Sequence, residues 1–191
     1  MTIKTMTVPT GGGLYTVGWH ELKITKAEYG IWKSSGGDGK RYIDLWFEKY
    51  PDNSNLRIYE TKNKTTGEEF KIAGLFRYAN AGIMDVLKDP TGKKPVIQYD
   101  DEASGLIGKN INVYFYKETK TGNNYTRMND SIAPVEQEGE KLSYTESDVT
   151  SIKNATEANF QKRFGNTPAN GAFTEFPKTE TKKPDLDNVP F

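Results

Sequence analysis

The 191-residue chain is 35% hydrophobic, has a mean hydropathy of −0.76 and carries no net charge, which suits one folded domain with a polar appendage. It has no cysteine, which excludes a disulfide framework, thiol catalysis and cysteine-ligated metal sites. No apolar run reaches the length of a membrane span, and residues 1–4 lead into no apolar signal segment. We therefore expect a soluble protein that is neither secreted nor bound to a membrane.

The neutral total hides an uneven distribution of charge. Residues 1–135 hold 19 basic and 16 acidic side chains, whereas residues 136–191 hold 7 and 10. A mildly basic body followed by an acidic tail is one arrangement found in nucleic-acid-binding chains. The difference is small, so it supports such a function without deciding it.

Residues 1–13 end in consecutive glycines and predict a flexible leader. From residue 14 to about residue 135 the pattern is that of strands, because apolar and polar residues alternate between clusters of Gly, Asn, Asp and Pro. In the second run, for example, Ile43, Leu45 and Phe47 share one face, which we expect to point into the core. The predicted strands span residues 20–26, 42–48, 56–59, 111–116 and 125–128.

One segment, residues 75–87, has apolar residues at helical spacing and stops before Asp89 and Pro90, so it predicts a helix. A turn at residues 65–67 predicts an additional hairpin arm over 63–73, and residues 120–124 predict the turn of the last hairpin. Five strands with one helix between the third and fourth is the order of the OB-fold, a small Greek-key barrel. The sequence therefore predicts a mainly β, five-stranded OB-fold domain over residues 14–135.

The chain changes character beyond residue 135. Residues 136–164 predict a helical appendage, with a helix over 145–164 whose apolar residues are scattered. From residue 165 onward Asn, Thr, Pro, Gly and Lys dominate, and such a composition cannot form a packed core. We expect residues 165–191 to be a disordered tail.

The face of the predicted barrel opposite its core carries aromatic residues where a solvated strand normally carries polar ones. Tyr42 and Trp46 alternate with the core residues of their strand, and three other strands have Tyr or Arg at matching positions. Exposed rings interleaved with Arg and Lys are typical of a stacking surface for unpaired bases, with lysines following the phosphates. Alternatively, the rings are covered by residues 145–164, by the hairpin arm or by a second subunit. The predicted nucleic-acid-binding residues are Trp32, Lys33, Lys40, Arg41, Tyr42, Trp46, Arg57, Tyr59, Lys62, Lys64, Lys71, Tyr114, Tyr116, Lys117, Lys120, Tyr125 and Arg127.

The last seven residues, Asp185–Phe191, place spaced aspartates before a Pro-Phe end. This pattern resembles the tail tip of bacterial and phage single-stranded-DNA-binding proteins, although Lys182 and Lys183 make it less acidic. An aromatic ring and a free carboxylate on one residue suit capture by a basic-rimmed apolar pocket. The resemblance implies a partner-binding tip formed by Asp185, Asp187, Pro190 and Phe191.

The order of elements over residues 14–135 also resembles phage single-stranded-DNA-binding proteins built on an OB-fold. That resemblance implies non-catalytic, sequence-tolerant binding of single-stranded DNA during replication, recombination and repair. It also implies recruitment of replication or recombination proteins through the tip, and a location in the bacterial cytoplasm or, for a phage protein, the host cytoplasm. The oligomeric state is open, and a homo-oligomer is compatible with the sequence.

The residues of catalysis and of metal or cofactor binding are missing from the sequence pattern. The loop over residues 36–40 is not a phosphate-binding P-loop, because Ser34 and Arg41 stand where that motif needs Gly and Ser or Thr. His20 is the only histidine, so neither a histidine metal site nor a catalytic triad can be built. We expect no enzyme, no cofactor and no metal. Two other functions stay open: a virion-associated β-barrel that binds carbohydrate or protein, and a recombination mediator or annealing protein with the same fold.

Overall fold

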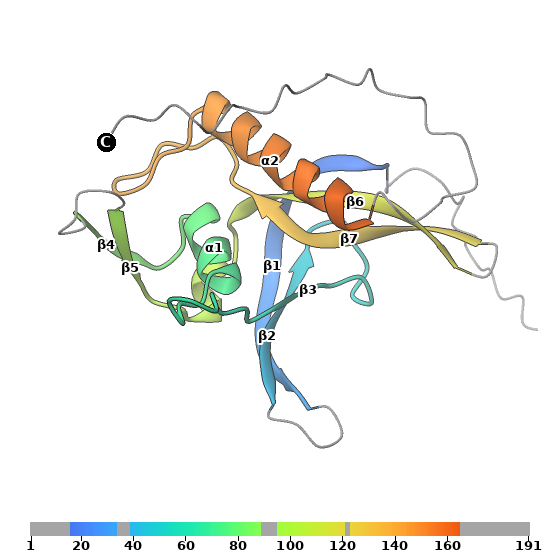
Figure 1. The fold of residues 1–191 in the computed structure, drawn as a ribbon, viewed down its shortest axis with the longest axis horizontal. Helices are drawn as coiled ribbons and strands as arrows, with labels where there is room; N and C mark the ends of the chain where they lie inside the picture. The colour runs from blue at the N-terminus through green and yellow to red at the C-terminus, as the bar shows by residue number, and fades with distance from the viewer. Residues whose placement is uncertain (1–15, 34–38, 89–94, 121–122, 165–191) are drawn as a thin grey trace, which may run out of the picture.

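The computed structural model describes residues 16–33, 39–88, 95–120 and 123–164, so the predicted leader, the tail and its tip lie outside the described residues. A five-stranded antiparallel sheet with the order β3-β2-β1-β6-β7 forms the centre of the molecule (Figure 1). A separate two-stranded hairpin, β4-β5, projects to one side. The strands are β1 (Gly18–Trp32), β2 (Lys40–Phe47), β3 (Leu56–Tyr59), β4 (Ile83–Lys88), β5 (Pro95–Tyr99), β6 (Asn110–Lys120) and β7 (Asn123–Ala133).

Strand β1 is shared between two partners. Its first half pairs with β6 and its second half pairs with β2, with a break in register between Ile24 and Lys26. Such a bulge shifts the alternation by one residue, so Leu22, Ile24 and Ala27 are all buried although a regular strand would expose Ala27. The sequence prediction covered only residues 20–26 of this 15-residue strand.

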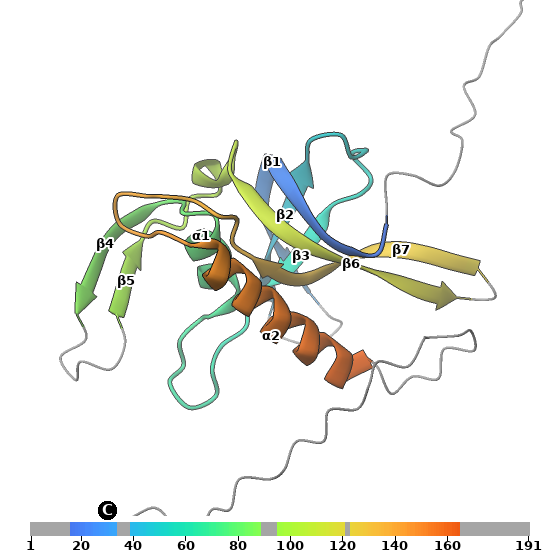
Figure 2. The same cartoon turned by 90° about the horizontal axis from the view of Figure 1, so that it is seen from above.

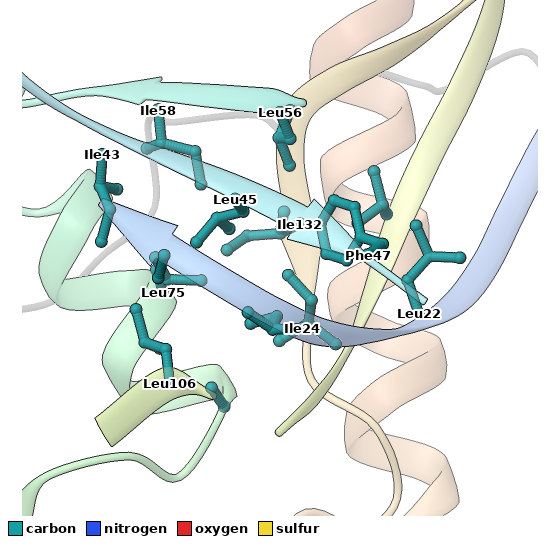
Figure 3. Packing of buried hydrophobic residues seen from close by; sticks show 14 of the residues in the cluster. Leu22, Ile24, Ile43, Leu45, Phe47, Leu56, Ile58, Leu75, Leu106 and Ile132 are labelled. Carbon is teal, nitrogen blue, oxygen red and sulfur yellow. The ribbon is translucent and has the colours of Figure 1, made fainter. Parts of the chain in front are cut away.

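The hydrophobic core lies inside the curled sheet. Ile43, Leu45 and Phe47 of β2 are buried there, which confirms the predicted inward face (Figure 3). Helix α1 (Lys71–Tyr78) contributes Leu75, and the short 3-10 helix η1 (Ala103–Leu106) contributes Leu106. These two elements cover the end of the sheet that its own strands leave open.

Over the described residues, the five strands that the sequence predicts as a barrel do not close into one. The fold is mainly β as predicted, but β3 and β7, which end the strand order, approach within 8 Å at their Cα atoms without pairing among the described residues. The described part of the chain therefore forms a curled open sheet, with α1 packed against β3 and β7.

The predicted helix over 75–87 is confirmed only for residues 75–78 and is wrong for the rest. Helix α1 spans 71–78, and residues 83–88 form strand β4. Asn80 and Gly82 adopt positive φ angles of 48° and 63°, and left-handed residues of this kind end a helix. The apolar residues after Gly82 pair with β5 instead, in a hairpin that the sequence analysis did not predict. The predicted arm over 63–73 is present only as a turn with one bridge, Lys62 to Glu69.

Helix α2 (Glu146–Phe164) confirms the predicted helix over 145–164 and lies across β6 and β7 (Figure 2). A capping box starts it: the Asp148 carboxylate accepts from the Thr145 amide at 3.0 Å, and the Thr145 hydroxyl accepts from the Asp148 amide at 3.3 Å. Val149 and Phe160 are its buried apolar residues. Among the described residues, no helix combines the length and apolarity that a membrane span requires.

Candidate nucleic-acid interface

The outer face of strands β1, β2 and β3 gathers most of the predicted stacking residues. The register of the β1–β2 hairpin places Gly30 beside Tyr42 and Lys26 beside Trp46, and β3 adds Tyr59 beside Tyr42. Trp32 at the end of β1 is 49% exposed. We call this surface the β1–β3 face. Its residues are Lys26, Glu28, Gly30 and Trp32 of β1, Lys40, Tyr42, Asp44 and Trp46 of β2, and Arg57 and Tyr59 of β3.

Three rings of the β1–β3 face each lie beneath a cation from a neighbouring strand. The Lys26 Nζ is 4.4 Å from the Trp46 ring centroid, and the Lys40 Nζ is 5.4 Å from that of Tyr59. The Arg57 guanidinium carbon is 3.8 Å from the centroid of the third ring, Tyr42. Cation–π attraction of this kind contributes about 0.5–1 kcal/mol at exposed sites. The face therefore holds aromatic and cationic groups in direct contact.

Arg57 is fixed more firmly than the two lysines. Its Nε and Nη2 donate to the two carboxylate oxygens of Asp44 at 2.8 and 2.7 Å. The Asp44 side chain is 11% exposed and that of Arg57 37% exposed. The hydrogen bonds that Arg57 donates to Asp44 raise the pKa of Arg57 above its usual range, against the opposing effect of burial.

Ion pairs reduce the charge of the β1–β3 face without cancelling it. The face carries three cations and two carboxylates. Glu28 pairs with Lys26 at 2.9 Å, and Asp44 pairs with Arg57. Lys40 has the ring of Tyr59 as its neighbour. The surface is weakly basic, so ring contacts have to contribute a large part of any binding to a polyanion.

The matching face of β6 is covered. Tyr114 and Tyr116 point away from the core as predicted, but Phe160 of α2 packs on both, with ring centroids 5.4 and 5.1 Å away. Tyr114 is only 5% exposed, and burial raises the pKa values of both phenols. Tyr114, which was predicted to be open to a ligand, is therefore covered, whereas Tyr116 stays partly exposed. The cover is the 145–164 segment that the sequence left open as an alternative.

The far end of the β6–β7 hairpin keeps three predicted residues accessible. Tyr125 is 44% exposed, and the Arg127 guanidinium is 6.0 Å from its ring centroid. Arg127 also forms an ion pair with Glu118. Lys117 is exposed, whereas the side chain of Lys120 lies outside the described residues. These groups are separated from the β1–β3 face by the part of the sheet that α2 covers.

The remaining predicted cations are dispersed. Arg41 points to the opposite side of β2, where it contacts the Tyr29 ring and donates to Asp101 at 2.8 Å. Lys62 pairs with Glu60 and Lys71 with Asp130. The exposed side chains of Lys33 and Lys64 belong to loops beyond the strands. The structure therefore does not gather these five cations with the aromatic residues.

Sequence reasoning missed Lys26, Gly30, Glu28 and Asp44, which complete the β1–β3 face. A signal for the first two was present, because Trp32 and Lys40 flank a glycine-rich loop symmetrically. Counting outward from that loop pairs Gly30 with Tyr42 and Lys26 with Trp46. No pattern in the sequence assigned Asp44 to Arg57.

Other features of the described residues lie apart from the β1–β3 face. A hollow of about 1040 Å³ lies between α1, β5 and the end of α2, and Lys71 is the only predicted binding residue that lines it. Within the described ranges there is no cluster of three or more side chains suited to hold a metal ion. His20 donates from Nε2 to the Thr16 carbonyl at 2.8 Å and contacts the Phe115 ring edge-on. The sequence matches no known protein-family model, and it matches no curated protein.

Proposed function

We propose that the β1–β3 face binds single-stranded DNA without sequence preference. The observation that carries this proposal is the set of three rings, each in contact with a cation, on the part of the sheet that α2 leaves uncovered. Unpaired bases present π faces that stack on such rings, and every base has one, so binding tolerates any sequence. Phosphates then attract the ammonium groups of Lys26 and Lys40, which are held by contacts that water can replace.

The strand arrangement supports an OB-fold as the finer description of the domain. In the order β3-β2-β1-β6-β7, the first strand is shared between the second and the fourth strands of the sheet, and a helix follows the third. A partly open five-stranded Greek-key barrel has this arrangement, and OB-folds bind oligonucleotides on the face of their second and third strands. Those strands correspond to β2 and β3 here.

In this proposal the chain coats unpaired strands during DNA replication or recombination. Recruitment of other proteins through Asp185, Asp187, Pro190 and Phe191 remains a prediction from the sequence, since these residues lie outside the described part. Mediation of recombination or strand annealing uses the same chemistry and would differ in its partners. The protein has no catalytic role in this proposal.

The test compares three labelled ligands of equal length by fluorescence anisotropy: oligo-dT, a duplex and an abasic oligodeoxynucleotide. We expect oligo-dT to bind much more tightly than the duplex, because stacking requires free base faces. The abasic strand carries the same phosphates without bases, so it should bind weakly as well. Equal affinity for oligo-dT and duplex, or for oligo-dT and the abasic strand, would refute the proposal.

The salt dependence separates this function from a carbohydrate- or protein-binding module. Each phosphate contact on a single strand contributes about −0.7 to the slope of log affinity against log salt. We expect a slope that corresponds to a few contacts, since the β1–β3 face carries three cations, two of them in ion pairs. A salt-independent interaction with oligo-dT would contradict phosphate recognition.

A further inference from the structure

The Tyr42 ring is enclosed by its neighbours instead of standing free on the sheet. A Cβ atom added at Gly30 would lie 2.3 Å from Tyr42 Cζ and 2.4 Å from its Oη, so the ring end rests directly on the β1 backbone. Tyr59 approaches it edge-on, with ring centroids 5.8 Å apart. The Arg57 guanidinium covers the ring face at 3.8 Å. A base could reach this ring only by displacing Arg57.

Displacement of Arg57 is opposed by Asp44. The two hydrogen bonds at 2.8 and 2.7 Å hold the guanidinium side-on, and such bidentate pairs are both strong and specific in orientation. The carboxylate is nearly buried, so moving Arg57 away would leave a desolvated charge without its partner. Lys26 and Lys40 have no comparable restraint, since each meets its ring as a single ammonium group.

A guanidinium held in this way is itself a stacking surface. It is planar, it stays charged, and it stacks on bases in single-stranded recognition. Its side chain keeps 37% of its surface exposed. Nη1 is free of the Asp44 bonds and can donate to a base edge.

We propose that a base stacks on Arg57 at the β3 edge of the β1–β3 face. Asp44 orients the guanidinium and the Tyr42 ring supports it. This inference rests on the proposed binding of single strands and assigns different roles to residues of that site. Trp46 and Tyr59 receive bases after their lysines move to phosphates. Tyr42 supports the guanidinium from below, and Asp44 is a positioning residue that contacts no nucleic acid.

The Arg57→Lys variant tests the stacking role, because lysine keeps the positive charge and loses the planar group. We expect affinity for oligo-dT to fall about 5- to 150-fold, the range for losing one stacked base. Affinity for the abasic strand and the salt slope should stay unchanged. An affinity for oligo-dT within twofold of the unmodified chain would overturn the inference. An equal fall in affinity for the abasic strand would also overturn it, because Arg57 would then act on the phosphates and not on a base.

The Asp44→Asn variant gives a second test in which simple electrostatics predicts the opposite sign. Removing a carboxylate from a DNA-binding surface should raise affinity if only charge mattered. We expect a fall comparable to that of Arg57→Lys, because one amide cannot accept both guanidinium bonds. Glu28→Gln is the matched control: Glu28 is the register partner of Asp44 on the same face, is 56% exposed, and holds no arginine. It should bind slightly more tightly.

Tighter binding by Asp44→Asn, as by Glu28→Gln, would show that Asp44 has no positioning role. Thermal unfolding of each variant identifies any loss caused by misfolding, and Arg57→Lys decides the question if Asp44→Asn does not fold. Failure of the inference is distinct from failure of the proposed function. If only the inference fails, the unmodified chain still prefers oligo-dT to the abasic strand. If the proposed function fails, the unmodified chain shows no such preference, and both proposals are refuted.

Discussion

Replacing Phe160 by alanine should release helix α2 from the sheet while the sheet itself stays folded. Phe160 is 8% exposed and contacts the rings of Tyr114 and Tyr116. Truncating a buried Phe to Ala costs about 3–5 kcal/mol. Among the described side chains of α2, Val149 is also buried, and its burial contributes only about 1.5–3 kcal/mol. That gain cannot hold a 19-residue helix in place against the entropy of ordering it.

The core of the sheet does not include Phe160, so the loss should stay local. Hydrogen exchange measured by mass spectrometry should show the amides of α2 exchanging rapidly, with those of β2 and β6 still protected. The phenols of Tyr114 and Tyr116 should titrate closer to pH 10 by ultraviolet absorbance, because burial is what raises their pKa values.

Lys162→Ala is the matched control for this experiment, since the Lys162 side chain is exposed in the last turns of the same helix. It should leave both the exchange pattern and the tyrosine titration unchanged. If Phe160→Ala also leaves α2 protected, then the contacts of Phe160 do not hold the helix and the reasoning fails. Cooperative loss of protection throughout the sheet would show that α2 is part of the core.

Three further predictions concern the sheet. Trp46→Ala should weaken oligo-dT binding about 5- to 150-fold in an anisotropy titration without unfolding the domain. Leu45→Ala should instead lower the free energy of unfolding in urea by about 2–5 kcal/mol; the reverse pattern would show that the inner and outer faces of β2 are wrongly assigned. Gly30→Ala should push the Tyr42 ring aside, weaken oligo-dT binding and lower the unfolding free energy by about 1–3 kcal/mol. Unchanged affinity would show that binding does not depend on the packing of Tyr42 on Gly30. Burial, then Asp101, raises the pKa of Tyr29, so its contribution to stability is complete below about pH 10 and is lost as the pH rises further; urea unfolding at pH 8 and pH 11 should show a smaller loss in Tyr29→Phe, and equal losses would contradict it.

Local alternation predicted the parts of the fold that depend on one strand at a time. The inward positions of Ile43, Leu45 and Phe47 followed from the period of two, and the start of α2 followed from the acidic residues around Asp148. The position of α1 did not follow, because its apolar spacing continues by coincidence into β4. The left-handed Asn80 ends the helix, and one sequence gives little warning of that.

The alternation of apolar and polar residues did not predict contacts between elements that are distant in the sequence. Alternation showed that Tyr114 leaves the core, but it could not show that α2 covers it. It also could not show the bulge after Ile24, which changes the face of every later residue of β1. Alternation along β2 and β3 therefore predicted Tyr42, Trp46, Arg57 and Tyr59, but it did not show that Asp44 holds Arg57 across strands.

The division of β1 between two partners has a consequence for synthesis on the ribosome. Its second half finds β2 within one hairpin, but its first half must wait for β6, and Glu21 and Asn110 are 89 residues apart. At 5–20 residues per second, that wait lasts roughly 5 to 20 s. During this time the unpaired edge and Leu22 are available to chaperones. Closing so long a loop should also make this pairing the slow step of refolding, which pulse-labelled hydrogen exchange would detect as late protection of residues 18–23.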